Sequence, residues 1–152
     1  MSSILFYRFP PNPSIMPAIK VRMIEGFKLE GLDDKGHSIT MDLPKDLGGE
    51  GAGFTPMELL LITLAGCTTL DIINILRKQR QNLSSLEVYA EGDRAEEPPR
   101  YYTQIRLKYI LKGNALSEDA VKRAICLSEE KYCSVMANLR GMSKITTSYE
   151  IK

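Results

Sequence analysis

The sequence lacks several features that would place it quickly in a functional class. It contains no tryptophan, one histidine and three cysteines in 152 residues. The odd number of cysteines and the absence of a CxxC pair argue against a secreted disulfide framework and a four-ligand zinc site, so we expect reduced thiols. Twenty Lys and Arg oppose nineteen Asp and Glu, which leaves a formal charge of +1. Without a basic field, binding to nucleic acid or to an anionic membrane is not expected.

A long hydrophobic run and a targeting signal are also lacking. The most apolar stretch, residues 57–66, is interrupted by Thr63 and has about half the length of a bilayer span, so no transmembrane segment is predicted. The first residues lack the pattern of a secretory signal, and we expect a cytoplasmic protein. Four prolines in residues 9–17 exclude a helix there. Residues 1–17 are predicted to be a flexible leader, and residues 18–152 a single domain.

The remaining composition is typical of a globular protein, with 43% hydrophobic and 26% charged residues. Apolar and polar residues alternate over residues 18–31 and again over 38–41, around an Asp-Asp-Lys-Gly turn, which predicts a hairpin. Further strands are predicted at residues 86–91, 101–111 and 143–152. One apolar face of the second of these strands is formed by Ile105, Leu107, Tyr109 and Leu111.

A long central helix is predicted after a glycine-rich loop at residues 45–56. Thr55 and Glu58 have the spacing of a capping box, and a proline between them suits a first helical turn. Basic residues suit the end of the helix near Arg80. Its first half, residues 59–65, is apolar on nearly every side and is expected inside the protein or inside a dimer.

Two shorter helices are predicted in the second half of the chain. One starts at a Ser117 cap and ends near residues 131–133, and the other covers residues 134–141 and ends at a glycine. The resulting order is two strands, a long helix, two strands, the shorter helices and a last strand. This order lacks the regular alternation of a doubly wound sheet and predicts an α+β fold.

Two of the cysteines lie in these shorter helices. Cys126 lies between Ile125 and Leu127 in an amphipathic segment and is interpreted as a small core residue. Cys133 is expected at a helix junction, where free backbone N–H groups and Lys131 could lower the pKa of its thiol. A buried structural cysteine is the alternative for this position.

Cys67 ends the apolar half of the long helix. At 100° per residue, Thr63, Asp71 and Asn74 fall on the same side of that helix as Cys67 and form a polar stripe on an apolar surface. A stripe of this kind that points inward suggests a functional reason for the thiol. A thiolate there would need a helix N-terminus or a cation, because desolvation alone raises the pKa of a thiol.

Two segments resemble motifs of one protein family. The segment PMELLLITLAGCTTLDI is similar to the first cysteine motif of the OsmC/Ohr family, the osmotically inducible and organic hydroperoxide resistance proteins, and KYCSV is similar to the second. The spacing between Cys67 and Cys133 is close to the family's, and the resemblance covers residues 18–152. It implies an OsmC-like fold, with strand hairpins around a long central helix, in an intertwined homodimer.

The resemblance also implies a function in oxidative stress defence. Cys67 would be the peroxidatic residue, which attacks an organic hydroperoxide and becomes a sulfenic acid, and Cys133 would resolve it as an intramolecular disulfide. A dithiol reductant would then reopen the disulfide. An apolar pocket would favour alkyl or lipid peroxides over hydrogen peroxide. We expect no bound cofactor and no metal.

The sequence departs from the family's pattern at the glutamate. In the family it directly follows the proline, whereas here Met57 holds that place and Glu58 comes one residue later. On a continuous helix Glu58 and Cys67 lie on opposite sides and about 13 Å apart along the axis. Glu58 therefore joins the site only through a break near Gly66 or from the other subunit. Otherwise it serves as the capping partner of Thr55.

The second departure concerns the family's amino-terminal arginine, for which Arg22 and Lys28 are the cations in the right region, neither in a matching motif. Both departures are typical of the less characterised OsmC-like branch. They leave an alternative function, a redox-sensing or small-ligand-binding dimer with little or no peroxidase activity. His37 follows a turn glycine and is expected at an exposed or strand-edge position. A metal site of Cys67, Cys133 and His37 would have only three candidate ligands at uninformative spacing.

Overall fold

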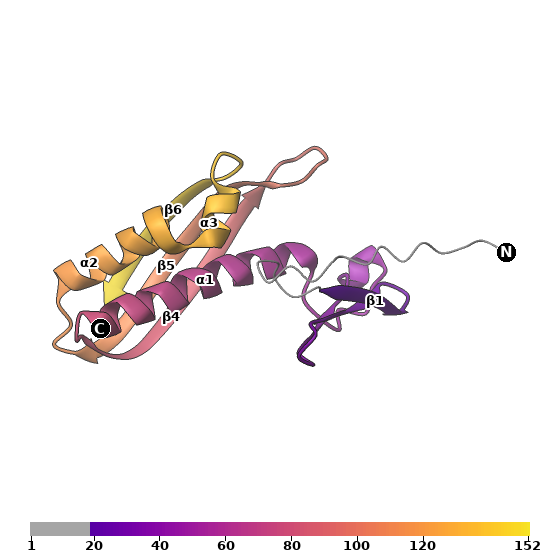
Figure 1. Ribbon diagram of the computed structural model, residues 1–152. Helices are drawn as coiled ribbons and strands as arrows, with labels where there is room; N and C mark the ends of the chain where they lie inside the picture. The colour runs from indigo at the N-terminus through magenta and orange to yellow at the C-terminus, as the bar shows by residue number, and fades with distance from the viewer. Residues whose placement is uncertain (1–18) are drawn as a thin grey trace, which may run out of the picture. The chain divides into compact units, whose positions relative to one another are not determined.

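The structure, a computed structural model, describes residues 19–152 (Figure 1). The leader predicted for residues 1–17 lies outside the described residues. The chain divides into two compact units, of which the first ends at Thr55 and the second covers Pro56–Lys152. The single domain predicted for residues 18–152 stays a prediction.

The first unit contains a three-stranded antiparallel sheet in the order β1-β2-β3. The strands are β1 (Lys20–Glu25), β2 (Lys28–Leu32) and β3 (Ser38–Met41). The prediction of one continuous strand over residues 18–31 was wrong, because the chain reverses at Gly26. This residue has a φ of 54°, in the left-handed region that glycine adopts without a steric penalty. The predicted hairpin is confirmed as the β2–β3 pair.

The glycine-rich loop after β3 is organised by one buried carboxylate. Asp42 is 3% exposed and accepts backbone N–H groups of Leu43, Glu50 and Ala52 at 2.8 to 3.0 Å. The hydrogen bond from Ala52 is the main cause that holds the pKa of Asp42 below its ordinary value. A short 3-10 helix, η1 (Lys45–Leu47), lies within this loop.

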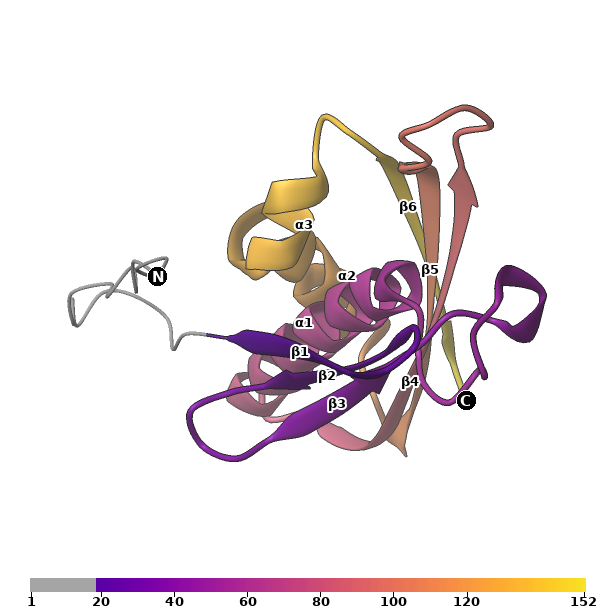
Figure 2. The ribbon, with the colours of Figure 1, turned by 90° about the vertical axis from the view of Figure 1, so that its right-hand side faces the viewer.

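The sheet of the second unit has the strand order β4-β5-β6 (Figure 2). Its strands are β4 (Asn82–Arg94), β5 (Tyr102–Asn114) and β6 (Lys144–Ile151). β4 and β5 form an antiparallel pair, and β6 lies parallel to β5. The strands predicted from the sequence are present, and β4 and β5 extend beyond the predicted bounds.

Helices cover one face of this sheet (Figures 1 and 2). They are α1 (Pro56–Lys78), α2 (Glu118–Leu127) and α3 (Ser134–Leu139), with a π-helical segment η2 (Ser128–Tyr132) between the last two. The Ser117 hydroxyl accepts the Ala120 N–H and caps α2 as predicted. Because parallel strands need a long crossover, α2, η2 and α3 form the connection from β5 to β6.

The core lies between these helices and the sheet. The predicted face of β5 is confirmed, since its four residues are at most 1% exposed. They belong to one apolar cluster with Leu64, Ile72 and Leu76 of α1 and with Val121 and Ala124 of α2. Cys126 does not belong to it. The prediction of a core role for Cys126 was wrong, because its side chain lies on the exposed side of α2.

α1 is apolar on more sides than the second unit covers. In the described part of the chain it is the helix that is long and apolar enough to cross a bilayer by length and composition, but only 28% of its most apolar window is buried. The apolar stretch of residues 57–66 that argued against a membrane span is part of a helix of 23 residues. Leu64, Ile72 and Leu76 are fully buried in the core, as expected for the core helix of a globular unit.

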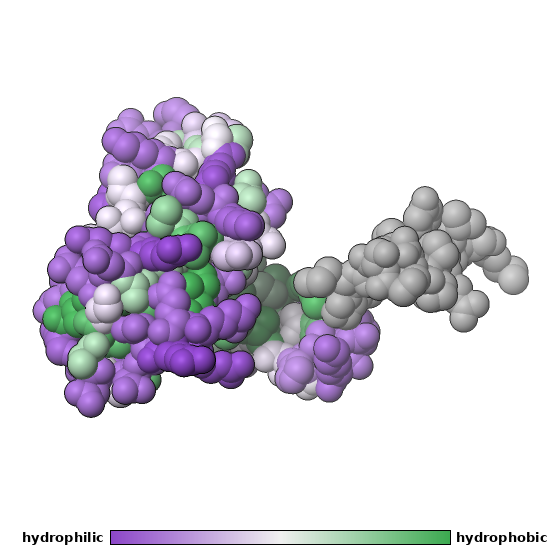
Figure 3. Space-filling model, turned by 60° about the vertical axis from the view of Figure 1, so that its left-hand side comes forward, coloured by the Kyte–Doolittle hydropathy of each residue, from purple (hydrophilic) through white to green (hydrophobic). Residues whose placement is uncertain are grey.

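Large apolar side chains of α1 also remain on the surface. Ile62, Leu70 and Ile73 are 45%, 71% and 41% exposed. Residues 59–65 were expected inside the protein or inside a dimer. Leu64 is the buried member of this stretch, and burial of its exposed members in a dimer stays a prediction. Figure 3 shows hydrophobic surface between hydrophilic regions on one side of the molecule.

Candidate functional site

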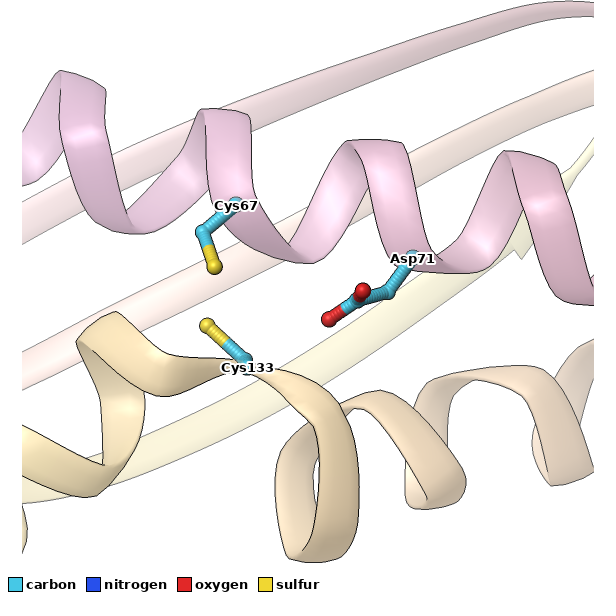
Figure 4. A group of neighbouring side chains, drawn as sticks. All are labelled: Cys67, Asp71 and Cys133. Carbon is cyan, nitrogen blue, oxygen red and sulfur yellow. The ribbon is translucent and has the colours of Figure 1, made fainter. Parts of the chain in front are cut away.

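Cys67 and Cys133 lie beside each other in the second unit, together with Asp71. The two sulfur atoms and a carboxylate oxygen of Asp71 all lie within 4.8 Å of one another. Figure 4 shows the two thiols pointing toward one another, Cys67 from α1 and Cys133 from the start of α3, with the carboxylate next to them. Two cysteines far apart in the sequence thus share one site.

α1 presents Cys67 and Asp71 on one face, because residues four apart on a helix are neighbours. Both side chains are half-buried. Of the predicted polar stripe, Asp71 is the residue that reaches the cysteine pair. Thr63 and Asn74 are exposed, and the Thr63 hydroxyl donates to the Leu59 carbonyl at 2.6 Å.

The hydroxyl groups next to Cys67 are used within the helix itself. Thr68 is fully buried and donates to the Ala65 carbonyl at 3.0 Å, and Thr69 donates to the same carbonyl at 2.7 Å. These threonines were expected to offer donors to the sulfur of Cys67. Their bonds to the backbone instead satisfy the hydroxyl protons locally, as is common for threonine in a helix.

The π-helical segment places Cys133. The Cys133 N–H donates to the Ser128 carbonyl at 2.8 Å, and the Cys133 sulfur, as the N-cap of α3, accepts the Met136 N–H at 3.3 Å. A π-turn inside a helical run is a feature often found at functional sites. In this case it ends the crossover helix at the residue that faces Cys67.

Cys133 is 3% exposed, and the pKa of its thiol is raised to about 11, mainly by burial. Cys67 and Asp71 contribute to this increase in pKa, whereas the Met136 N–H opposes it. The interpretation of Cys133 as a buried cysteine at a helix start is therefore confirmed, whereas the lowering of its thiol pKa that its neighbours could cause is not found. The Lys131 ammonium lies 5.5 Å from the centre of the Tyr132 ring, and desolvation outweighs the help from the backbone.

Asp71 is held by a residue that the sequence analysis did not single out. The Ser128 hydroxyl is fully buried and donates to the Asp71 carboxylate at 3.0 Å. This bond joins α1 to the first residue of the π-helical segment, just before Cys133. A serine at the end of an amphipathic helix carries no pattern that would reveal such a partner.

A groove of about 530 Å³ reaches Asp71, while neither Cys67 nor Cys133 lines it. Its wall includes Asp71, Ile75 and Leu127 together with the charged Asp119 and Arg123. This groove carries both apolar and charged groups, and the apolar pocket that the family resemblance implies beside Cys67 stays a prediction. It gives solvent a route to the carboxylate of Asp71.

Glu58 does not approach Cys67 within the chain. α1 continues through Gly66 without interruption, so the break that would bring these residues together is absent from the described helix. Glu58 is exposed in the first turn. The pKa of Tyr102 is raised mainly by burial and also by the charge of Glu58. The Tyr102 hydroxyl donates to the Met57 carbonyl at 3.0 Å.

The candidate residues of the first unit have partners of their own. Arg22 pairs with Glu30 across the β1–β2 ladder at 2.6 Å. His37 contacts Asp33 at 2.6 Å and has an 81% exposed side chain, which confirms the exposed position expected for it. Among residues 19–152, one group of side chains that could hold a metal ion consists of Cys67, Asp71 and Cys133. His37, considered as a third ligand from the sequence, does not belong to this group.

Comparison with known proteins gives consistent matches over most of the chain. Residues 48–148 match the family described as OsmC-like protein. Protein YhfA of Escherichia coli K12 is 41% identical over 133 residues, which is 87% of this chain and 96% of that protein. The crystal structure of a hypothetical protein from Aquifex aeolicus has a TM-score of 0.80 at 30% identity and covers 91% of this chain and 97% of that one.

A more distant structure carries a functional name. It is that of an organic hydroperoxide resistance protein OsmC from Legionella pneumophila, with a TM-score of 0.67 and 17% identity over 90% of this chain and 98% of that one. At this identity the likeness concerns the fold. The α+β fold with strand hairpins around a long central helix, predicted from the sequence, is confirmed as the fold of these proteins, and in this chain the strands form two small sheets.

Proposed function

Since the chain belongs to the OsmC-like family, we propose that it is a thiol-dependent reductase of organic hydroperoxides that acts in oxidative stress defence in the cytoplasm. The observation that carries this proposal is the pairing of a half-buried thiol, Cys67, with a buried thiol, Cys133, within 4.8 Å. The different solvent exposure of two neighbouring thiols fits a two-cysteine peroxidase, in which one cysteine reacts with the peroxide and the other forms the disulfide with it.

Cys67 is the proposed peroxidatic residue, because its side chain is the more accessible of the two. The Cys67 thiolate attacks the outer oxygen of ROOH and breaks the O–O bond. The sulfur becomes a sulfenic acid and the alkoxide takes up one proton to leave as ROH. The peroxide is thereby reduced by two electrons, which the sulfur supplies.

Cys133 is the proposed resolving residue. Its thiol attacks the sulfenic acid sulfur, one water molecule leaves, and a Cys67–Cys133 disulfide forms. Burial and a pKa of about 11 keep this thiol protonated and protect it from direct oxidation by peroxide. A dithiol reductant then reduces the disulfide by thiol–disulfide exchange and restores both thiols.

Asp71 is proposed to transfer protons in this cycle. Its carboxylate lies within 4.8 Å of both sulfurs and is held by Ser128. It can accept the proton of the Cys67 thiol and return it to the departing alkoxide.

We further propose an intertwined homodimer. Exposed apolar residues lie on α1 in the second unit and on β1 in the first, where Val21 and Met23 are exposed, and a dimer interface would cover such residues. In such a dimer, the family's catalytic arrangement would require Glu58 of the partner subunit to come beside Cys67. Light scattering coupled to size exclusion tests the dimer, and a monomer at micromolar concentration would contradict it.

A second function is favoured by the charge beside the thiols. The group next to the pair is the anionic Asp71, and the influences on the pKa of Cys133 include no cation. An unactivated pair of this kind suits a redox sensor or a small-ligand-binding dimer with little turnover. Such a protein would form the disulfide slowly with one equivalent of peroxide and would not sustain catalysis.

The deciding experiment treats the reduced protein with one equivalent of cumene hydroperoxide and maps its thiols by mass spectrometry. We expect a Cys67–Cys133 disulfide in the wild type, and a sulfenic acid on Cys67 that a dimedone probe traps in Cys133→Ser. Cys126→Ser is the matched control and should behave as the wild type. Turnover with a dithiol reductant separates the two functions, and turnover that persists in Cys67→Ser would exclude the peroxidase.

A further inference from the structure

The cysteine pair and its carboxylate also have the composition of a metal site. Three ligand atoms, the sulfurs of Cys67 and Cys133 and a carboxylate oxygen of Asp71, lie within 4.8 Å of one another. Around a tetrahedral ion with bonds of about 2.0 to 2.3 Å, ligand atoms are separated by roughly 3.5 to 3.8 Å. To bind such an ion, the three ligand atoms must come closer together, which needs a shift of about an ångström at most at each side chain.

The way these ligands are held favours binding. Cys67 and Asp71 project from one helix face at the i, i+4 spacing that also serves paired ligands in helical zinc motifs. Cys133 approaches from the opposite side, on a backbone held by its hydrogen bond to Ser128. The ligand set is therefore built on two elements that already face each other.

Ser128 supplies the support that metal ligands usually have. It donates to one oxygen of the Asp71 carboxylate, which fixes the orientation of the carboxylate and leaves lone pairs for an ion. The groove of about 530 Å³ that Asp71 lines offers an entry path from solvent.

From these contacts we propose that the reduced protein binds one Zn²⁺ ion through Cys67, Asp71 and Cys133, with water or a small ligand in the fourth position. Two sulfur ligands select a thiophilic ion and reject Mg²⁺ and Ca²⁺, which take oxygen ligands. Binding converts both thiols to coordinated thiolates and releases two protons, with no change of oxidation state.

Metal binding and peroxide reduction then exclude each other. A coordinated Cys67 sulfur shares one of its lone pairs with the ion and is a weaker nucleophile towards peroxide than the free thiolate, and the coordinated Cys133 sulfur is held away from disulfide formation. Formation of the disulfide removes both sulfur ligands and releases the ion. The proposal uses the same residues as the proposed peroxidase but depends only on their being reduced, so it can be tested without any peroxide.

The test uses the full chain, reduced with a phosphine, freed of metal with a chelator and titrated with Zn²⁺ against a chromogenic indicator. We expect one equivalent of Zn²⁺ per chain and no competition from Mg²⁺. Co²⁺ should give the thiolate-to-metal charge-transfer band of a sulfur-ligated ion. Uptake well below one equivalent, or a Co²⁺ spectrum without this band, would overturn the proposal.

Variants assign the ligands. Cys67→Ser should abolish the charge-transfer band or weaken Zn²⁺ binding by at least about a hundredfold, and Asp71→Asn by about tenfold to a hundredfold. Cys126→Ser, which removes the exposed thiol, should bind as the wild type. Unchanged affinity in Cys67→Ser, or loss of binding in Cys126→Ser, would refute the site. Both test residues are half-buried, and circular dichroism checks that their variants fold.

The outcome is independent of catalysis. A protein that binds Zn²⁺ through this cluster but forms no disulfide with cumene hydroperoxide would support the metal site and contradict the proposed peroxidase. If both are correct, one equivalent of Zn²⁺ should slow disulfide formation at least about tenfold, and a chelator should restore the rate. An unchanged rate in the fully loaded protein would contradict a site at Cys67 and Cys133.

Discussion

The Ser128 hydroxyl donates a 3.0 Å hydrogen bond to the Asp71 carboxylate and thereby joins the π-helical segment before Cys133 to the helix that carries Cys67. The distance between the two thiols of the candidate site depends on the separation of these two elements. A buried serine next to a half-buried carboxylate therefore controls geometry as well as stability.

Ser128→Ala tests this relationship. We expect a loss of about 1 to 3 kcal/mol in the free energy of unfolding, because the variant leaves a partly buried carboxylate without its donor. Disulfide formation after one equivalent of peroxide should also slow, since Asp71 and the segment around Cys133 lose their tether. Urea unfolding measures the first effect. The exposed Ser84→Ala on β4 is the control, and equal stabilities of both variants would show that the bond contributes nothing.

The raised pKa of Cys133 predicts how its thiol responds to pH. At pH 7 a thiol of pKa about 11 has more than about a hundredfold less thiolate than an ordinary thiol. Iodoacetamide should therefore modify Cys133 much more slowly than Cys67 in the folded, chelator-treated protein. Its rate should still increase above pH 9, where an ordinary thiol levels off. Mass spectrometry of timed samples measures both rates, and a plateau for Cys133 below pH 9 would contradict the shift.

Asp42 makes a pH-dependent contribution to stability. Its pKa is lowered in the folded state, so its contribution is present above the unfolded pKa of about 3.9 and is lost as pH falls through the folded value. Asp42→Asn should destabilise the protein at pH 7, and the difference from the wild type should shrink below pH 4. The control Asp34→Asn, at an exposed turn position, should change little. A difference for Asp42→Asn that is equal at pH 7 and pH 3 would refute the argument.

Two buried tyrosines on β5 should differ when they are changed to phenylalanine. The Tyr109 hydroxyl is buried and has no hydrogen-bond partner among the described residues, whereas the Tyr102 hydroxyl donates to the Met57 carbonyl. Tyr109→Phe should leave the free energy of unfolding unchanged or raise it by up to about 1 kcal/mol, and Tyr102→Phe should lower it by about 0.5 to 1.5 kcal/mol. Denaturant titration of both variants checks this, and the reverse order would contradict it.

Residues with a clear periodicity were predicted well from the sequence. The alternation in β5 identified the residues that pack on the helices, and Ser117 and Thr55 marked where α2 and α1 begin. Signals of this kind reflect interactions between residues that are close in the sequence. Cys126 shows their limit, because a cysteine between two apolar residues can still face solvent when the helix turns its other side to the core.

The candidate site was predicted in its residues but not in its chemistry. Family resemblance selected Cys67 and Cys133, whereas no local pattern reveals that a π-turn buries Cys133 and raises the pKa of its thiol. Asp71 was recognised as part of a polar stripe. Its partner Ser128 is distant in the sequence, and only the packing of the crossover against α1 brings them together.

The position of the two cysteines has a topological consequence. A bond between them would enclose the second half of α1, the strands β4 and β5, and all of α2 in one covalent ring. Closing a ring of this length restricts the unfolded chain by about 4 kcal/mol in the chain-entropy description. Oxidation of the two cysteines would then stabilise most of the second unit against unfolding, and reduction would remove this stabilisation. The redox state of the cell would thereby help to set the lifetime of the molecule.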